Sequence, residues 1–144
     1  FSRQGIETFL NREYTVTSDF DRMGCRLEGP FIAQKETSDI ISDGTVFGSV
    51  QVPSHGKPII LLADRQTTGG YAKIATVASV DIPKVVQRKT DHKIRFRAIT
   101  VEEAQELYLK EVQELDGMRR IIHQPCKEVL ECRLVAKRLR KLFE

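Results

Sequence analysis

Short alternating runs of hydrophobic and polar residues fill the first hundred residues of the chain. The run Tyr71–Ile82 alternates regularly enough to predict a strand with two different faces. The run Pro58–Ala63 is almost continuously apolar, which is typical of a strand buried on both faces. Glycine-containing turns at 43–44 and 54–56 separate the runs. The pattern therefore predicts a mainly β domain at residues 1–100, built as a closed or nearly closed barrel.

A helical pattern follows the barrel, at residues 101–144. Thr100 and Glu103 form the signature of a capping box, which predicts a helix from Val101 to about Leu115. The pair Asp116–Gly117 is expected to end this helix. A second helix is predicted beyond it, with a single apolar seam at Cys132, Val135, Leu139 and Leu142. The chain is therefore predicted to end in a helical extension.

The charge of the chain is concentrated near its C-terminal end. The net charge is +3, yet residues 117–144 hold eight Lys and Arg against three Asp and Glu. This basic segment suits either a solvated helix face or a contact with an acidic partner or RNA. The β region has no aromatic ladder flanked by basic residues, so nucleic-acid binding is not predicted. No run of about 18 apolar residues occurs, so no membrane span is expected.

The cysteines and histidines give no sign of a metal site or a disulfide framework. Cys25, Cys126 and Cys132 contain no Cys-x-x-Cys pair, which is typical of reduced thiols in a cytoplasmic protein. The three histidines are scattered without the spacing of metal ligands. The first residues show no basic segment followed by an apolar core, so no signal peptide is predicted. We therefore predict a cytoplasmic protein without a bound metal.

Three stretches of the sequence together resemble the allophanate hydrolase subunit 2 family. They are DRMGCRLEGP at 21–30, GSVQVPSHGKPIILLADRQTTGGYAKIATV at 48–77, and RFR at 95–97 followed by VEEA. This family includes the C component of 5-oxoprolinase and is also described as biotin-dependent carboxyltransferase-like. The resemblance covers roughly residues 10–105. It implies a cyclophilin-like β-barrel, the second of two such subdomains, with the N-terminal subdomain missing from this chain.

The resemblance also implies a function within an enzyme complex. The first hypothesis is an ATP-dependent 5-oxoprolinase that opens a lactam to give glutamate, together with a partner that resembles allophanate hydrolase subunit 1, the B component of 5-oxoprolinase. The first alternative is carboxyl transfer from carboxybiotin to urea or a related amide. The second is a non-catalytic module that binds a kinase-inhibitor-type partner. The chain lacks a glycine-rich phosphate loop, so ATP, or biotin on a carrier domain, is expected to come from elsewhere in the complex.

The loop from Asp64 to Tyr71 places many hydrogen-bonding side chains beside a buried strand. Asp64 can accept N–H groups, and Gln66 can pair with an amide in both senses. Such groups suit a small planar amide substrate, although a loop bonded to its own backbone explains them equally well. The family resemblance implies that the loop lines the substrate cleft. On that basis Asp64, Gln66 and Tyr71 are predicted to be catalytic.

Eight further residues are predicted to bind the substrate. The Arg side chains could neutralise a carboxylate or phosphate, and the glycines allow the backbone to approach closely. Gln51 lies between apolar neighbours, so its amide needs a buried partner, either a ligand or a neighbouring strand. For Arg22 and Arg26 the alternative is an ion pair with Asp that locks a strand end. The eight residues are Arg22, Arg26, Gln51, Arg65, Thr67, Thr68, Gly69 and Gly70.

Overall fold

The computed structural model describes residues 1–35 and 39–124 of the chain. These residues belong to two compact units, Phe1–Leu109 and the unit that begins at Lys110. The first unit contains every described strand. The second begins within the long helix α3, Val101–Ile122. The predicted helix beyond Pro125, with its apolar seam, lies outside the described residues.

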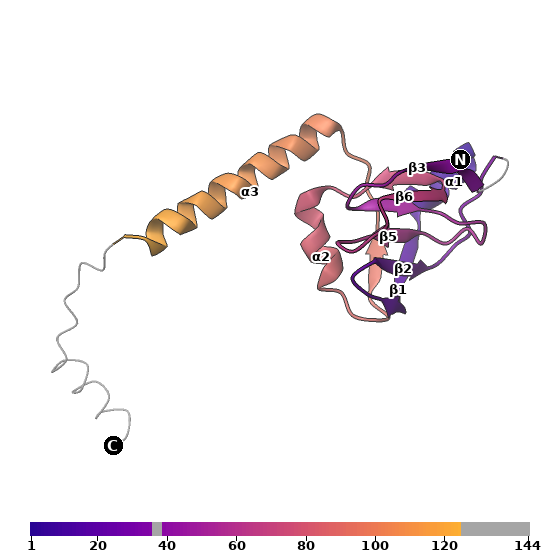
Figure 1. The fold of residues 1–144 in the computed structure, drawn as a ribbon, viewed down its shortest axis with the longest axis horizontal. Coiled ribbons are helices and arrows are strands. Elements are labelled where there is room, and N and C mark those ends of the chain that lie inside the picture. Colours follow the sequence, from indigo (N-terminus) through magenta and orange to yellow (C-terminus); the bar gives the residue numbers. More distant parts are fainter. Residues whose placement is uncertain (36–38, 125–144) are drawn as a thin grey trace, which may run out of the picture. The chain divides into compact units, whose positions relative to one another are not determined.

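A curled six-stranded antiparallel sheet forms the centre of the first unit (Figure 1). Its strands lie in the order β7-β4-β5-β2-β1-β8. Within the described residues β7 and β8 are the two edges and do not pair with each other, so the sheet is a half-barrel rather than a closed one. The prediction of a mainly β fold with a C-terminal helix is confirmed. The strand bounds are β1 Glu13–Phe20, β2 Gly24–Glu28, β4 Ser49–Gln51, β5 Ile59–Leu61, β7 Lys73–Thr76 and β8 Lys93–Arg95.

A smaller two-stranded sheet is built from β3, Asp39–Gly44, and β6, Thr68–Tyr71. The two strands run antiparallel and lie side by side in Figure 1. The backbone N–H of Thr45 donates to the carbonyl oxygen of Thr67 at 2.9 Å, which continues the pairing beyond the strand ends. An ion pair of 2.8 Å between Asp43 of β3 and Lys73 of β7 links the two sheets.

One face of the six-stranded sheet forms the hydrophobic core. Cys25, Ile60 and Val50 occupy neighbouring strands in matching register and are completely buried. Since successive side chains of a strand point to opposite faces, this register turns one set of residues inward on three strands. Helix α1, Arg3–Asn11, adds Phe9, whose ring stacks on Phe96 at a centroid distance of 4.3 Å. Helix α2, Ile82–Val86, adds two further buried apolar side chains.

Two short helices, α1 and α2, form where the pattern predicts none. Helix α1 begins at Ser2, whose Oγ accepts the backbone N–H of Gly5 at 3.0 Å. The predicted strand from Tyr71 to Ile82 was wrong beyond Thr76. A 3₁₀ turn at Ser79–Asp81 leads directly into α2 there, and a proline lies in the first turn of α2, where its fixed φ and missing N–H are tolerated.

Helix α3 begins as predicted but continues further than expected. The backbone N–H of Glu103 donates to Thr100 Oγ1 at 3.1 Å, so the predicted cap is confirmed. The expected end at Asp116–Gly117 was wrong, because Gly117 does not adopt the positive φ that ends helices. A mid-helix glycine costs only about 1 kcal/mol. The good helix formers on either side outweigh that cost, and α3 runs on to Ile122.

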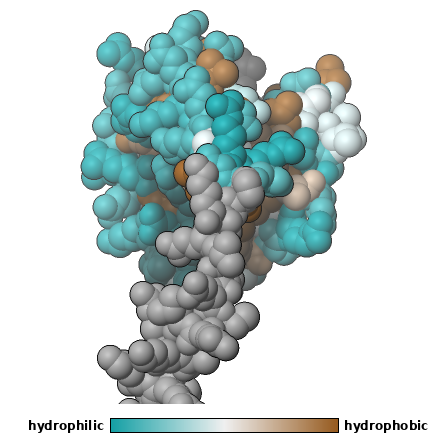
Figure 2. Space-filling view, turned by 90° about the vertical axis from the view of Figure 1, so that its left-hand side faces the viewer, coloured by the Kyte–Doolittle hydropathy of each residue, from teal (hydrophilic) through white to brown (hydrophobic). Residues whose placement is uncertain are grey.

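The surface of the described residues is predominantly polar. The face in Figure 2 is mostly hydrophilic, with hydrophobic residues scattered across it. None of the helices in the described part of the chain has both the length and the apolar character needed to cross a membrane.

We predict that Gly5→Ala destabilises the protein although it places a better helix former in α1. A Cβ at this position would lie 2.1 Å from the carbonyl oxygen of Ala33, and backbone atoms cannot move away easily. We expect a loss of about 1–3 kcal/mol in unfolding free energy. Urea unfolding followed by far-UV circular dichroism measures it. Gly117→Ala is the matched control, since its Cβ meets nothing within 4 Å. An unchanged midpoint for Gly5→Ala would contradict the packing described.

We also predict that the Cys25 thiol is unreactive in the folded protein. Burial raises the pKa of Cys25 to about 11 from 9.0, which lowers the thiolate fraction at neutral pH by about 100-fold. Mass spectrometry of the peptide that contains Cys25 should show slow alkylation by iodoacetamide in buffer and fast alkylation in concentrated urea. Equal rates in both conditions would show that this part of the sheet opens readily.

Candidate functional site

A polar cleft of about 720 Å³ lies on the face of the six-stranded sheet opposite the core. Its floor is set by strand register. Arg26 of β2 and Gln51 of β4 both pair with Ile59 of β5, so these three residues share one face. The walls come from the β1–β2 turn, the β4–β5 turn and the loop that precedes β6. Four of the predicted site residues line this cleft: Arg26, Gln51, Gln66 and Tyr71.

Gln51 lies at the base of the cleft, and its side chain is buried, with 1% of its surface exposed. Its Oε1 accepts a long hydrogen bond of 3.4 Å from Gln66 Nε2. Its own Nε2 has no hydrogen-bond partner among the described residues. A buried amide donor without a partner costs stability, and such groups are uncommon in folded proteins. This N–H₂ group is therefore a donor available to a molecule in the cleft.

Gly69 allows the amide of Gln51 to occupy this position. A Cβ on Gly69 would lie 2.6 Å from Gln51 Nε2 and 3.4 Å from Gln66 Nε2. The glycine therefore contributes space beside the two amides. Gly70, in contrast, faces the carbonyl oxygen of Ile40 at 3.5 Å and has ordinary contacts.

Arg26 and Tyr71 provide the charged and phenolic groups of the cleft. Both side chains are exposed, and neither forms an ion pair or side-chain hydrogen bond with the residues that the structure describes. Arg26 can therefore offer its guanidinium to an anion, since its planar N–H groups match a carboxylate. Together with the amide of Gln51, these side chains form a cleft that can hold a carbonyl group and an acidic group at the same time.

The remaining predicted residues have other partners or lie outside the cleft. Asp64 and Arg22 form a two-point ion pair on the surface, with contacts of 2.7 and 3.0 Å. Arg65 lies over the ring of Phe47 at 5.9 Å and bonds the carbonyl of Leu62. Thr67 and Thr68 are exposed and do not line the cleft. The ion-pair alternative for Arg22 thus matches the geometry observed, whereas Arg26 is free of such a pair among the described residues.

The hydrogen bonds of the Asp64–Tyr71 loop come from outside the loop. Thr45, just after β3, holds it through two groups: its backbone N–H donates to Thr67 O, and its hydroxyl donates to Gln66 O. Gln66 is thereby fixed with its amide beside Gln51. The loop is positioned by a neighbouring strand rather than by its own side chains.

Asp21 and His55 also line the cleft, although the sequence pattern does not single them out. Asp21 Oδ1 accepts the backbone N–H groups of Met23 and Gly24 at 2.8 and 3.0 Å, so it organises the β1–β2 turn. His55 Nδ1 accepts the backbone N–H of Lys57 at 3.2 Å, so the ring hydrogen is on Nε2 in the neutral form. The turn at 54–56 is predicted correctly as a turn, but no spacing signal marks its histidine.

The cleft offers no obvious metal ligands. No group of three or more His, Cys, Asp or Glu side chains lies close enough to hold a metal ion in the part of the chain that the structure describes. The groups that face the cleft are amides, a guanidinium, a phenol and an imidazole. This set is suited to binding small polar molecules by hydrogen bonds.

The family of the chain is established by comparison with known proteins. The model of the family described as "Carboxyltransferase domain, subdomain A and B" matches residues 1–98. This match covers more than half of the chain and includes both sheets and the cleft. The chain therefore belongs to the carboxyltransferase-domain family, which agrees with the resemblance that the sequence motifs indicated.

Two curated relatives are each named as the C component of 5-oxoprolinase. The Haemophilus influenzae protein is 41% identical over 124 residues, which are 86% of this chain and 40% of that protein. The Escherichia coli protein is 36% identical over 104 residues, 72% of this chain and 34% of that protein. The chain therefore spans well under half the length of these relatives.

Solved structures show the same fold. The crystal structure of TTHA0988 is 33% identical with a TM-score of 0.60, over 68% of this chain and 19% of that one. The crystal structure of the K. lactis urea amidolyase gives a TM-score of 0.77 at 24% identity, over 81% of this chain and 8% of that one. The second likeness concerns the fold alone.

We predict that acid loosens the β3–β6 sheet from β7. The hydrogen bond and charge of Lys73 lower the pKa of Asp43 below 3.8, so the ion pair stabilises the fold at neutral pH. This contribution is lost as the pH falls below about 4, through the lowered pKa of the folded state. Hydrogen exchange of the β6 amides at decreasing pH, corrected for intrinsic rates, should show increased opening. In Asp43→Asn the opening should already be present at pH 7. A pH-independent opening in the wild type would refute the role of the pair.

Proposed function

We propose that this chain supplies the substrate-binding subdomain of a 5-oxoprolinase-type enzyme complex. In this role the cleft holds the lactam 5-oxoproline while ATP and partner polypeptides, including one that resembles allophanate hydrolase subunit 1, complete the reaction in the cytoplasm. Family membership and the two 5-oxoprolinase relatives support the proposal. The observation that carries it is the buried, unpartnered N–H₂ group of Gln51 at the base of the cleft.

The chemistry of 5-oxoproline matches the groups that face the cleft. Its ring amide offers a carbonyl acceptor and an N–H donor, and its carboxylate carries one negative charge. Gln51 Nε2 would donate to the carbonyl oxygen, and the Arg26 guanidinium would pair with the carboxylate. A donor fixed at the carbonyl oxygen stabilises the negative charge that develops there when the amide is attacked. Gln66 and Tyr71 are placed to complete the hydrogen bonding of the substrate.

Carboxyl transfer to urea or a related amide is the second candidate function. The family description and the urea amidolyase fold favour it. Urea also presents a planar carbonyl group, which Gln51 could hold in the same way. It has no carboxylate, however, so the reaction would not require Arg26 to bind an anionic substrate. Biotin on a carrier domain would then supply the carboxyl group.

We expect Gln51→Leu to lower kcat/KM by about 100-fold, the effect of removing one donor to a developing oxyanion. The assay is ATP-dependent glutamate formation from 5-oxoproline by the complete protein reconstituted with its partner polypeptides. Stability should change by less than about 1 kcal/mol, because the donor that is lost has no partner among the described residues. Gln87→Leu, on the exposed end of α2, is the matched control. Full activity of Gln51→Leu would refute the proposed role.

Arg26→Gln separates the two enzymatic candidates. Loss of 5-oxoproline turnover with this variant is expected if the substrate is the lactam acid. Biotin-dependent carboxylation of urea that Arg26→Gln leaves unaffected would instead identify a carboxyltransferase. Tight binding to a partner polypeptide without any response to 5-oxoproline or urea would indicate a non-catalytic interaction module.

A further inference from the structure

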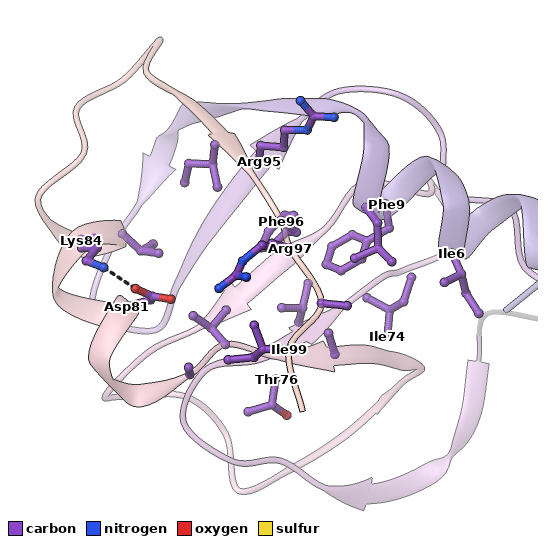
Figure 3. Close-up of a pocket in the computed structure, with 18 of the residues that line it drawn as sticks. Ile6, Phe9, Ile74, Thr76, Asp81, Lys84, Arg95, Phe96, Arg97 and Ile99 are labelled. Carbon is purple, nitrogen blue, oxygen red and sulfur yellow. Dashed lines mark hydrogen bonds and ion pairs between the residues drawn. The ribbon is translucent and has the colours of Figure 1, made fainter. Parts of the chain in front are cut away.

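A second cavity, of about 630 Å³, lies on the core side of the sheet, between its two edges β7 and β8. It is separate from the polar cleft, which lies on the opposite face. Figure 3 shows Phe9, Phe96, Ile74 and Ile99 pointing toward one another across it. Its apolar lining includes Phe9, Val50, Ile74, Val85, Ile94 and Phe96. An open apolar cavity of this size at a sheet opening is a surface that favours being covered.

The backbone on both sides of the cavity has free hydrogen-bonding groups. Strand β7 pairs only with β4, so its outer edge is unpaired within the described residues. The segment Phe96–Ile99, which follows β8, makes no backbone–backbone hydrogen bond with the residues that the structure describes. Free N–H and C=O groups beside an apolar surface are a template for an added extended chain. A fatty-acid-like molecule would leave these groups unused.

The mouth of the cavity carries unneutralised positive charge. Six charged residues line it, and only one, Asp81, is acidic. Asp81 pairs with Lys84, as Figure 3 shows. Lys93 and Arg97 pair with glutamates outside the cavity. Arg88 and Arg95 are exposed and form no ion pair among the described residues. The mouth therefore favours an occupant with carboxylates at its ends.

We propose that this cavity is the docking site for an extended segment of a partner polypeptide. The segment has apolar side chains at alternate positions, which enter the cavity, and acidic residues at its ends, which meet Arg88 and Arg95. Its backbone pairs with the edge of β7 and with Phe96–Ile99, so that it closes the open sheet. The C-terminal segment of the chain itself does not fit, because residues 117–144 carry eight basic residues against three acidic ones.

Synthetic peptides with blocked ends test the proposal on the full chain. The probe is a short alternating Val–Thr peptide with Asp at both ends, and its matched control has Lys at both ends. A third peptide carries Pro at its central position, which removes a backbone donor. We expect the acidic peptide to bind about tenfold more tightly than the Lys peptide, the effect of two exposed ion pairs. The Pro peptide should bind more weakly than its parent.

The double variant Arg88→Glu and Arg95→Glu tests the charge at the mouth without disturbing the core. It should reverse the preference, so that the Lys peptide binds more tightly than the acidic one. Hydrogen exchange should show protection of the amides of residues 73–76 and 96–99 only when the preferred peptide is bound. This protection separates pairing at the sheet edges from charge attraction elsewhere on the surface.

Three results would overturn the proposal. Equal binding of all peptides, or no binding, would show that the cavity does not take an extended segment. Binding of decanoate, with protection of the cavity and no effect of the acidic peptide, would indicate a small amphipathic anion instead. Concentration-dependent dimerisation that protects the same amides would identify a second copy of this chain as the occupant.

Discussion

The alternation of side chains across three adjacent strands organises the whole first unit. Cys25, Ile60 and Val50 point to one face and build the core, while Arg26, Ile59 and Gln51 point to the other and build the cleft. A slip of one residue in any of these strands would exchange the two sets and place a guanidinium in the core. The core and the cleft therefore depend on the same register, and the hydrophobic requirement of one face fixes the geometry of the other.

Gln51 shows how this constraint creates a candidate site. Its amide is carried into a buried position because its neighbours in the short strand β4 are needed elsewhere: Val50 in the core and Ser49 at the turn, where its hydroxyl accepts the N–H of Val46. The fold thereby keeps an amide donor without a partner among the described residues, at a cost in stability. Gly69 leaves room for it, and Thr45 holds the loop that brings Gln66 alongside. Buried polar groups left in this way are common where ligands bind.

The open sheet and the length of the chain relative to its relatives point in the same direction. The chain spans 40% and 34% of the two 5-oxoprolinase proteins that it matches. Within the described residues its sheet leaves two edges unpaired beside an apolar cavity with a basic mouth. Both observations favour a unit that works in contact with further polypeptide. The polar cleft and the apolar cavity lie on opposite faces, so a partner strand can occupy one without blocking the other.

The sequence by itself determined the β class, the cap that starts α3 and the family. These follow from local signals: alternation, the Thr100–Glu103 spacing, and long runs of unusual composition. It also predicted Arg26, Gln51, Gln66 and Tyr71 as site residues, and their joint action in binding stays a prediction. Tertiary structure alone decided that Asp64 pairs with Arg22, that His55 lines the cleft, and that α1 and α2 replace coil and strand. Partners distant in sequence and packing against the sheet fix these features, and a local pattern carries no record of either.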